Sequence, residues 1–145
     1  MDLEFNIKLS DVNIKAVKEE LEKDKLKILR LWGSKAVEKS VDAISGNAGI
    51  QSAVDTGRLR ASISYILPDG EQGSKEDDSE NQHAGDKLSG KADKDSVFVG
   101  SNVEYAIYVH EGAKKMPARP FLRLGIDNMK EDAEEMAERV LKGEI

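Results

Sequence analysis

Hydrophobic and polar residues alternate at the start of the chain and then follow a helical spacing. Leu3, Phe5, Ile7 and Leu9 are separated by single polar residues, which is the period of a half-buried strand. Ser10 or Asp11 can cap the helix that follows. Its apolar stripe comprises Ile14, Val17, Leu21, Ile28, Trp32, Ala36, Val41 and Ile44. Glycine and asparagine in residues 45–49 predict the end of this long helix.

The second half of the chain predicts two more strands, a helical turn and a final helix. Thr56 is a candidate N-cap for one turn over residues 57–61, and residues 63–67 then alternate as a strand that Pro68 and Gly70 end. Residues 96–101 resume as a strand, and we expect the two strands to pair. Pro120 suits the first turn of a helix. The apolar stripe of that helix comprises Leu122, Ile126, Met129, Ala133, Met136 and Val140. Two helices against a small antiparallel sheet predict a single α+β domain over residues 1–145.

The segment between the paired strands differs from the rest of the chain in composition. Residues 68–96 hold nine acids and four lysines, and residues 69–94 have almost no large apolar side chains. The net charge of the whole chain is −6, so most of its acidity lies in this segment. Such a composition buries too little surface to offset the entropy of ordering. We therefore expect a flexible acidic hairpin loop, and a loop of this length is commonly functional.

Composition excludes several classes of protein. The chain has no cysteine, which excludes disulfides and thiol chemistry and fits a reducing cytosol. It has no apolar run long enough to span a membrane, and its first ten residues lack the pattern of a secretory signal. We therefore expect no membrane partner and no export. The negative net charge argues against a general nucleic-acid binder.

His110 and Glu111 are the first candidates for acid–base or metal chemistry. They do not form the helical zinc motif, because no second histidine follows four residues on, and His83 lies in the acidic loop. A surface or interface histidine is the favoured interpretation of His110. No nucleophile elbow, phosphate loop or paired-glycine fingerprint is present. We expect no enzyme activity, no cofactor and no metal.

A group of cations is the second candidate site. Its members are Arg58, Arg60, Lys114, Lys115, Arg119 and Arg123. They flank predicted turns and could contact a phosphate backbone or another subunit. The favoured interpretation is a solvated basic face that balances nearby acids, and phosphate contact without sequence readout is the alternative.

The stretch "VEYAIYVHEGAKKMPARPFLRLGI", residues 103–126, contains the densest set of unusual residues. Tyr105 and Tyr108 are expected on a turn or short helix. Pro117 and Pro120 fix the backbone and Phe121 can anchor it, which predicts a rigid connector that sets the angle of the last helix. A proline-rich ligand is the alternative. The pattern favours structure over catalysis.

These blocks resemble the head–tail joining or tail-completion family of long-tailed bacteriophages and prophages, whose members are often described as minor tail proteins. That family shows a Val-Asp-Thr-Gly-x-Leu-x-x-Ser segment, then Val-Gly and Tyr-Ala-x-Tyr-Val-x-x-Gly, then Pro-Ala-Arg-Pro-Phe-Leu. The matching residues are Val54, Asp55, Thr56, Gly57, Leu59, Ser62, Val99, Gly100, Tyr105, Ala106, Tyr108, Val109, Gly112, Pro117, Ala118, Arg119, Pro120, Phe121 and Leu122. His110 departs from the residue that members more usually carry.

The resemblance implies a non-enzymatic structural protein of the virion neck. It implies a ring, commonly a hexamer, between the head connector or head-closure protein and the tail tube or tail terminator, with genome DNA passing through the lumen. Such a protein resides in the host cytoplasm during assembly and at the head–tail junction afterwards. The alternatives are a tail terminator or another minor tail protein and, from a different class, a DNA-binding accessory protein that uses the cation group.

Overall fold

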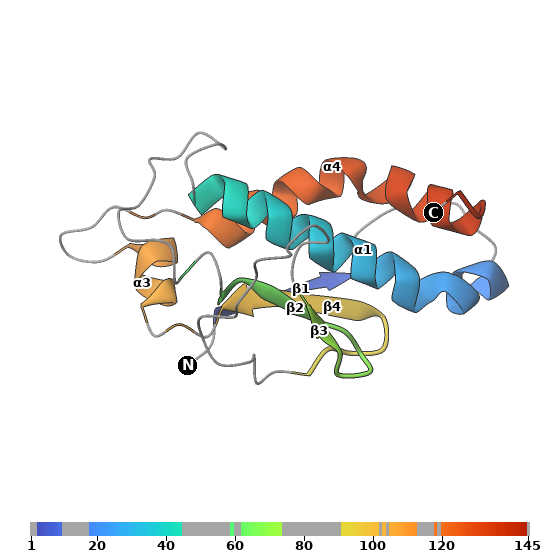
Figure 1. Cartoon of the computed structure of the whole chain (residues 1–145), viewed down its shortest axis with the longest axis horizontal. Coiled ribbons are helices and arrows are strands. Elements are labelled where there is room, and N and C mark those ends of the chain that lie inside the picture. Colours follow the sequence, from blue (N-terminus) through green and yellow to red (C-terminus); the bar gives the residue numbers. More distant parts are fainter. Residues whose placement is uncertain are drawn as a thin grey trace.

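The computed structural model describes residues 3–9, 18–44, 59, 62–73, 91–101, 103, 105–112, 118 and 120–144; for residues 18–23 it describes the backbone alone. Along the chain, its helices and strands are β1 (Leu3–Lys8), α1 (Lys18–Ile44), β2 (Ser64–Ile66), β3 (Gln72–Gly73), β4 (Ser96–Ser101), α3 (Ala106–Glu111) and α4 (Phe121–Leu141). Figure 1 shows the two long helices running side by side along the sheet. The α+β prediction is confirmed.

The described strands form one antiparallel sheet in the order β1-β4-β2-β3. The predicted pairing of the strands on either side of the acidic segment is confirmed, because Tyr65 of β2 pairs with Val99 of β4. On its other side Val99 pairs with Phe5 of β1. The N-terminal strand therefore forms one edge of the sheet and pairs with a strand from the second half of the chain.

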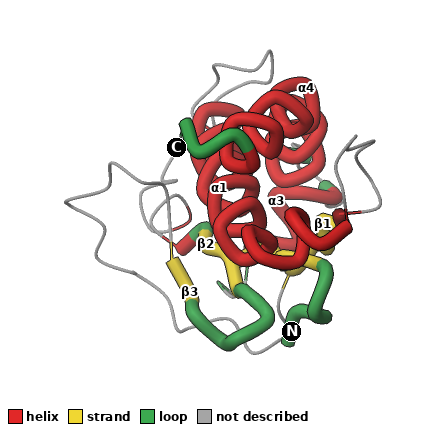
Figure 2. The backbone as a smooth tube through the Cα atoms, turned by 90° about the vertical axis from the view of Figure 1, so that its right-hand side faces the viewer, coloured by secondary structure: helices red, strands yellow, loops and turns green. Residues whose placement is uncertain are grey.

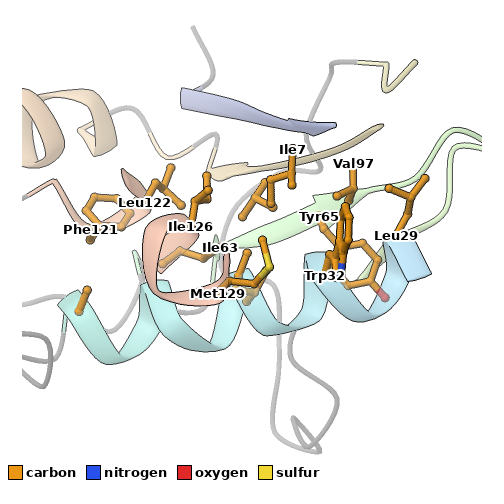
Figure 3. Close-up of a cluster of buried hydrophobic side chains, with 14 of the residues drawn as sticks. Ile7, Leu29, Trp32, Ile63, Tyr65, Val97, Phe121, Leu122, Ile126 and Met129 are labelled. Carbon is orange, nitrogen blue, oxygen red and sulfur yellow. The ribbon is translucent and has the colours of Figure 1, made fainter. Parts of the chain in front are cut away.

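Both long helices cover the same face of the sheet, as Figure 2 shows along the long axis. The core between these layers contains buried residues of every major element, among them Ile7, Trp32, Val97, Phe121 and Met129 (Figure 3). The indole Nε1–H of Trp32 donates a 3.0 Å hydrogen bond to the backbone oxygen of Ala133, which ties α1 to α4.

The two helices approach closely at one pair of small residues. A Cβ atom on Gly125 of α4 would lie 2.6 Å from the backbone nitrogen and 2.7 Å from the Cα atom of Ser40 on α1. Real Cβ atoms do not approach other atoms this closely, so glycine at this position allows the backbones to meet.

Element boundaries follow the predictions with small differences. α1 ends at Ile44, next to the predicted stop, while its predicted caps at Ser10 and Asp11 lie outside the described residues. Pro120 is the N-cap residue of α4, one position before its first turn, with φ of −75°. On α4 the buried stripe takes in Ala137, whereas Met136 is half-buried. The i, i+4 and i+7 row through Ala133, Ala137 and Val140 faces the core.

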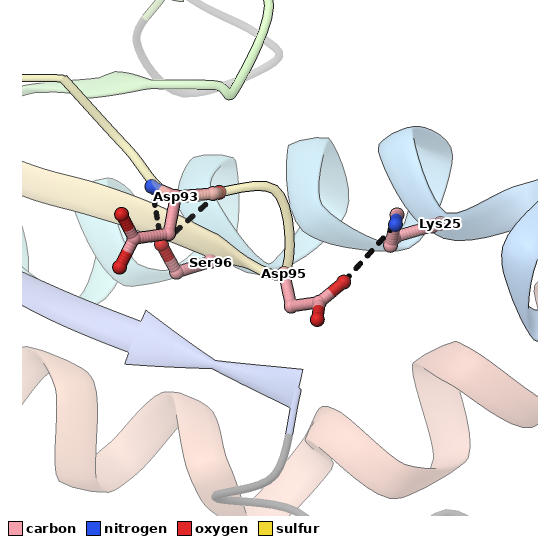
Figure 4. Close-up of polar contacts among 4 residues, drawn as sticks. All are labelled: Lys25, Asp93, Asp95 and Ser96. Carbon is pink, nitrogen blue, oxygen red and sulfur yellow. Dashed lines mark hydrogen bonds and ion pairs between the residues drawn. The ribbon is translucent and has the colours of Figure 1, made fainter.

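The predicted loop of residues 68–96 has defined structure at both of its ends. Pro68, Asp69 and Gly70 form a tight turn in which Gly70 has φ of +91°, and the two-residue strand β3 follows. At the other end, the Asp93 N–H donates a 3.0 Å hydrogen bond to Ser96 Oγ just before β4 (Figure 4). Residues 68–73 and 91–96 thus have defined structure where composition predicted a loop, and residues 74–90 lie outside the described residues.

α1 holds both of these ends through ion pairs. Arg30 contacts Glu71 at 2.7 Å next to β3, and Lys25 contacts Asp95 at 3.0 Å next to β4 (Figure 4). The two cations belong to neighbouring turns of the helix. Each pair contributes at most about 1 kcal/mol, because its members are partly exposed to solvent. Together they fix the positions from which the acidic segment leaves the sheet.

Candidate functional site

The short helix α3 forms a corner between the end of β4 and the start of α4. Its first turn is closed by the Ala106 N–H, which donates a 3.0 Å hydrogen bond to the Val103 oxygen. Gly112 ends the helix with φ of +88°, a backbone conformation that strongly favours glycine, and its N–H donates to the Tyr108 oxygen at 2.9 Å. The predicted turn or short helix carrying Tyr105 and Tyr108 is therefore present, and Gly112 has a clear backbone role.

Two motif blocks far apart in the sequence meet at this corner through buried hydroxyl groups. Ser62 Oγ donates a 2.7 Å hydrogen bond to the backbone oxygen of Leu59. The same atom lies 2.6 Å from Ser101 Oγ at the end of β4. Because the Ser62 proton is directed at Leu59, the Ser101 hydroxyl is the donor between the two serines. Ser101 Oγ in turn accepts the Val103 N–H at 3.2 Å. The chain from Leu59 to Val103 is thus joined by three consecutive hydrogen bonds.

Gly100 allows the strand before this corner to pack against β1. A Cβ atom at Gly100 would overlap the backbone oxygen of Leu3 and would lie 2.9 Å from Glu4 Cα. Both obstacles are backbone atoms that are held in the sheet, since Glu4 pairs with Gly100. The motif glycine is therefore a packing requirement of the β1–β4 pair.

The structure corrects the predicted environment of His110. The residue is 1% exposed, and its ring lies between two aromatic rings, with centroid distances of 5.1 Å to Phe5 and 5.3 Å to Phe121. The prediction of a surface histidine is wrong because α3 turns Ala106, Val109 and His110 toward the core.

Both nitrogens of the His110 ring have partners. Nδ1 lies 2.7 Å from Glu111 Oε1, and Nε2 lies 3.3 Å from the backbone nitrogen of Arg123. A backbone N–H can only donate, so Nε2 is the acceptor and the ring proton of the neutral histidine is on Nδ1. Burial lowers the pKa of His110 below its usual 6.5, although the hydrogen bond to Glu111 opposes that shift.

His110 thereby caps the N-terminus of α4, whose own N-cap residue makes no side-chain hydrogen bond. Pro120 occupies the N-cap position and makes no side-chain capping hydrogen bond. Arg123 is in the first turn of α4, where backbone N–H groups have no partner within the helix. The imidazole satisfies one of them. The accepting nitrogen of this candidate catalytic ring is therefore already hydrogen-bonded within the protein.

Apart from Gly100, Tyr108, Gly112 and Pro120, the predicted site residues divide into three groups. Leu59 and Phe121 are fully buried anchors of the core. Tyr105 is half-buried and Arg123 is exposed. The residues whose placement lies outside the described part of the chain are Asp55, Thr56, Gly57, Arg58, Arg60, Lys114, Lys115, Pro117 and Arg119. The convergence of the cation group is therefore still a prediction.

Tyr108 is the large motif side chain that faces solvent among the described residues. Its side chain is 57% exposed, and Glu111, one turn further along α3, has a side chain that is 53% exposed. The remaining surface of the helix is packed on the core. α3 thus presents one aromatic ring and one carboxylate outward.

A groove of about 480 Å³ between α1 and α4 was not predicted. Leu31 and Met136 contribute its apolar lining. Its charged residues are Lys27, Lys35, Asp132, Glu135 and Arg139. Periodicity places Met136 on the apolar stripe, but it does not show that this side chain is half-buried at the groove.

The acidic and histidine side chains and the helices of the described residues bear on metal binding and on membrane crossing. The described residues contain no group of three or more histidine or acidic side chains positioned to hold a metal ion. None of their helices combines the length and apolar character that crossing a membrane requires.

The fold and the corner define a small α+β protein whose described motif residues lie mostly in the core and in backbone turns, with the Tyr108 ring exposed. Residues 11–112 match the HK97-gp10-like family, described as "Bacteriophage HK97-gp10, putative tail-component". The chain belongs to this family of phage tail components, which makes it a tail-related structural protein of the virion. The match spans both the Val54–Ser62 block and the Tyr105–Gly112 block and ends before the Pro117–Leu122 run. Comparisons with curated proteins and with solved structures give no match.

Proposed function

We propose that the chain is a ring-forming adaptor at the head–tail junction of a tailed phage or prophage. It completes the tail, forms a ring, commonly a hexamer, and lets genome DNA pass through the lumen. The observation that carries this proposal is the family match over residues 11–112. The Pro117–Leu122 run, which resembles that of head–tail joining proteins, lies beyond the match and adds support.

The proposed action is assembly without catalysis or a cofactor. The arrangement of the corner supports this, because Gly100, Gly112, Ser62 and Leu59 hold the backbone and core. His110 is enclosed by aromatic rings and caps α4, so it has no open path to a substrate.

The proposed partners are other virion proteins. One face meets the head connector or head-closure protein, and the opposite face meets the tail tube or tail terminator. The net charge of −6 suits a ring through which a duplex moves, since a mainly negative lumen would hold DNA weakly. Before assembly the subunit resides in the host cytoplasm, and afterwards it lies in the neck.

Deleting the gene from the phage or prophage tests this function. The expected result is separate filled heads and finished tails, which join when the purified chain is added. Electron microscopy of the joined particles should then show a ring of this protein at the neck. Tails of uncontrolled length would instead identify a terminator. Normal particles, together with salt-dependent duplex binding by the purified chain, would indicate the DNA-binding alternative.

A further inference from the structure

The turn between β2 and β3 contains a pair of residues that can change the backbone spontaneously. Asp69 is followed by Gly70, and no other glycine in the chain follows an aspartate or an asparagine. In such a pair the glycine nitrogen can attack the aspartate side chain, because glycine has no side chain to obstruct the approach and samples a wide range of backbone angles. Both residues are exposed, and a Cβ atom on Gly70 would meet nothing within 4 Å. The turn projects from the sheet, so water and room for rotation are available (Figure 1).

The reaction isomerises aspartate through a cyclic imide. The Gly70 nitrogen forms a bond to the side-chain carboxyl carbon of Asp69. The nitrogen loses its proton and the carboxyl group loses a hydroxyl group, and these leave together as water. A second water molecule then opens the ring at either carbonyl. One opening restores aspartate, and the other leaves isoaspartate, in which the main chain runs through the former side chain and is longer by one methylene group.

Hydrogen bonds of the folded turn hold the reacting atoms away from the geometry of ring closure. The Gly70 N–H donates a 2.9 Å hydrogen bond to the backbone oxygen of Leu67. Asp69 Oδ1 accepts the Glu71 N–H at 2.9 Å, so the carboxyl group is directed past Gly70. With Gly70 at φ of +91°, this is the pattern of a tight hairpin turn that ends in a glycine bulge. The ring can close only after the turn opens and both bonds break.

α1 anchors this turn from outside. The backbone oxygen of Glu71 accepts the Leu67 N–H at 2.9 Å, which closes the base of the turn. The carboxylate of Glu71 contacts the Arg30 guanidinium at 2.7 Å. Both of these side chains are 46% exposed, so water and salt weaken the pair. How often the turn opens therefore depends on an ion pair that lies outside it.

We propose that Asp69–Gly70 is a site of spontaneous aspartate isomerisation that the folded turn suppresses, and that the Arg30–Glu71 pair sets how often the turn opens to react. The inference does not depend on the proposed function. Isoaspartate at position 69 would lengthen the turn and move the carboxylate that accepts the Glu71 N–H. It would therefore displace the point at which the acidic segment leaves β3.

Incubation of the full chain in water labelled with heavy oxygen tests the site. Ring opening takes its oxygen atom from solvent, so mass spectrometry of the peptide that contains Asp69 detects each reacted molecule, whichever way the ring opens. We expect the label to accumulate at least about tenfold more slowly in the native chain than in the same chain in urea, because only the open turn reacts. The control variant Asp69→Glu keeps the carboxylate but would need a larger ring that forms more slowly. It should stay unlabelled at this position.

Two variants of α1 test the anchor. Arg30→Gln removes the pair with Glu71, while Lys35→Gln removes a pair with Glu38 that lies within α1 at 3.4 Å. Both variants should keep the wild-type circular dichroism spectrum. Arg30→Gln should label position 69 about two- to fivefold faster than wild type, the change that corresponds to the loss of an exposed ion pair. Lys35→Gln should label it at the wild-type rate.

Each part of the inference has its own contrary result. If the chain in urea gains no more label at position 69 than Asp69→Glu does, the site does not react and the inference is overturned. Equal rates in the native chain and in urea would overturn the protection by the turn. A wild-type rate in Arg30→Gln, or an equal increase in Lys35→Gln, would overturn the role of the ion pair.

Discussion

The imidazole of His110 accepts the backbone N–H of Arg123 and so caps α4 from a different helix. The donor belongs to the first turn of α4, the acceptor to α3, and the two residues are separated by the predicted Pro117–Pro120 connector. A side chain therefore helps to set the angle at which α4 leaves the corner, while the predicted role of Pro117 lies outside the described residues. This relationship also makes the corner sensitive to protonation.

Stability should fall as the pH decreases below about 6.5, the usual pKa of histidine. The pKa of His110 is lower than 6.5 in the folded state, mainly because of burial. Between the two pKa values the unfolded chain binds a proton that the folded chain does not, so acid favours unfolding. The contribution is fully present above pH 6.5 and is lost as the pH falls toward the folded-state pKa. Urea unfolding from pH 7.5 to 5.5 measures this dependence.

The matched variant for this measurement is His110→Gln, which keeps a hydrogen-bonding side chain but does not titrate. It should be less stable than wild type at pH 7.5 and should show a weaker dependence on pH. His83 is present in both proteins, so any contribution it makes cancels. Equal pH dependence in the two proteins would show that His110 does not change its protonation on unfolding.

The hydroxyl chain between the two motif blocks should be important for stability. Ser62→Ala removes the acceptor of the Ser101 hydroxyl and the donor to the Leu59 oxygen, both of which are buried. An unsatisfied buried polar group costs about 1–3 kcal/mol, so we expect a loss in that range in the free energy of unfolding. Ser64→Ala is the control, because Ser64 is equally buried but makes a weaker bond of 3.4 Å to the Ser62 oxygen. Equal losses would contradict the special role of Ser62.

Gly100→Ala should disrupt the edge of the sheet. The added methyl group meets the backbone of Leu3 and Glu4, which cannot move without breaking the β1–β4 pairing. Overpacking of this kind costs about 1–3 kcal/mol. We expect a loss in that range in the free energy of unfolding, which chemical denaturation measures. Faster hydrogen exchange in residues 3–8 than in residues 64–66 would locate the damage at β1. A wild-type midpoint would show that β1 can shift without loss.

The sequence predicts the elements better than their contacts. Alternation over residues 3–9 predicts a strand because one of its faces packs on the core, and the stripe on α4 predicts a helix for the same reason. The strand predicted over residues 63–67 is also present, as Ser64–Ile66, but the structure buries it on both faces. The pairing of β1 with β4 is not readable from either strand, since it depends on residues far apart in the chain. The role of His110 was missed because no local pattern shows that a ring nitrogen meets Arg123. The Ser62–Ser101 bond has only a weak signal, a motif serine at position 62 and a serine directly after the Val99–Gly100 pair.

The acidic segment should be dispensable for folding but required for joining heads to tails. A variant in which residues 74–90 are replaced by a short Asn-Gly turn keeps Glu71 and Asp95, and therefore keeps both ion pairs to α1. The entropy of loop closure changes only logarithmically with length, so the free energy of unfolding should stay equal or rise slightly. What the variant loses is a run of acids that can reach a neighbouring subunit or a basic rim of the tail.

Circular dichroism and urea unfolding should therefore match wild type, while addition of the variant to separated heads and tails should yield few joined particles. A second variant that keeps the length of residues 74–90 but replaces their acids with serine and glutamine separates charge from reach. If the acids make the contact, this variant should fail to join heads to tails, as the short variant does. If only the length of the segment matters, joined particles should form. Normal joining by the short variant would identify the segment as a tolerated insertion in a protein that assembles through its folded surfaces alone.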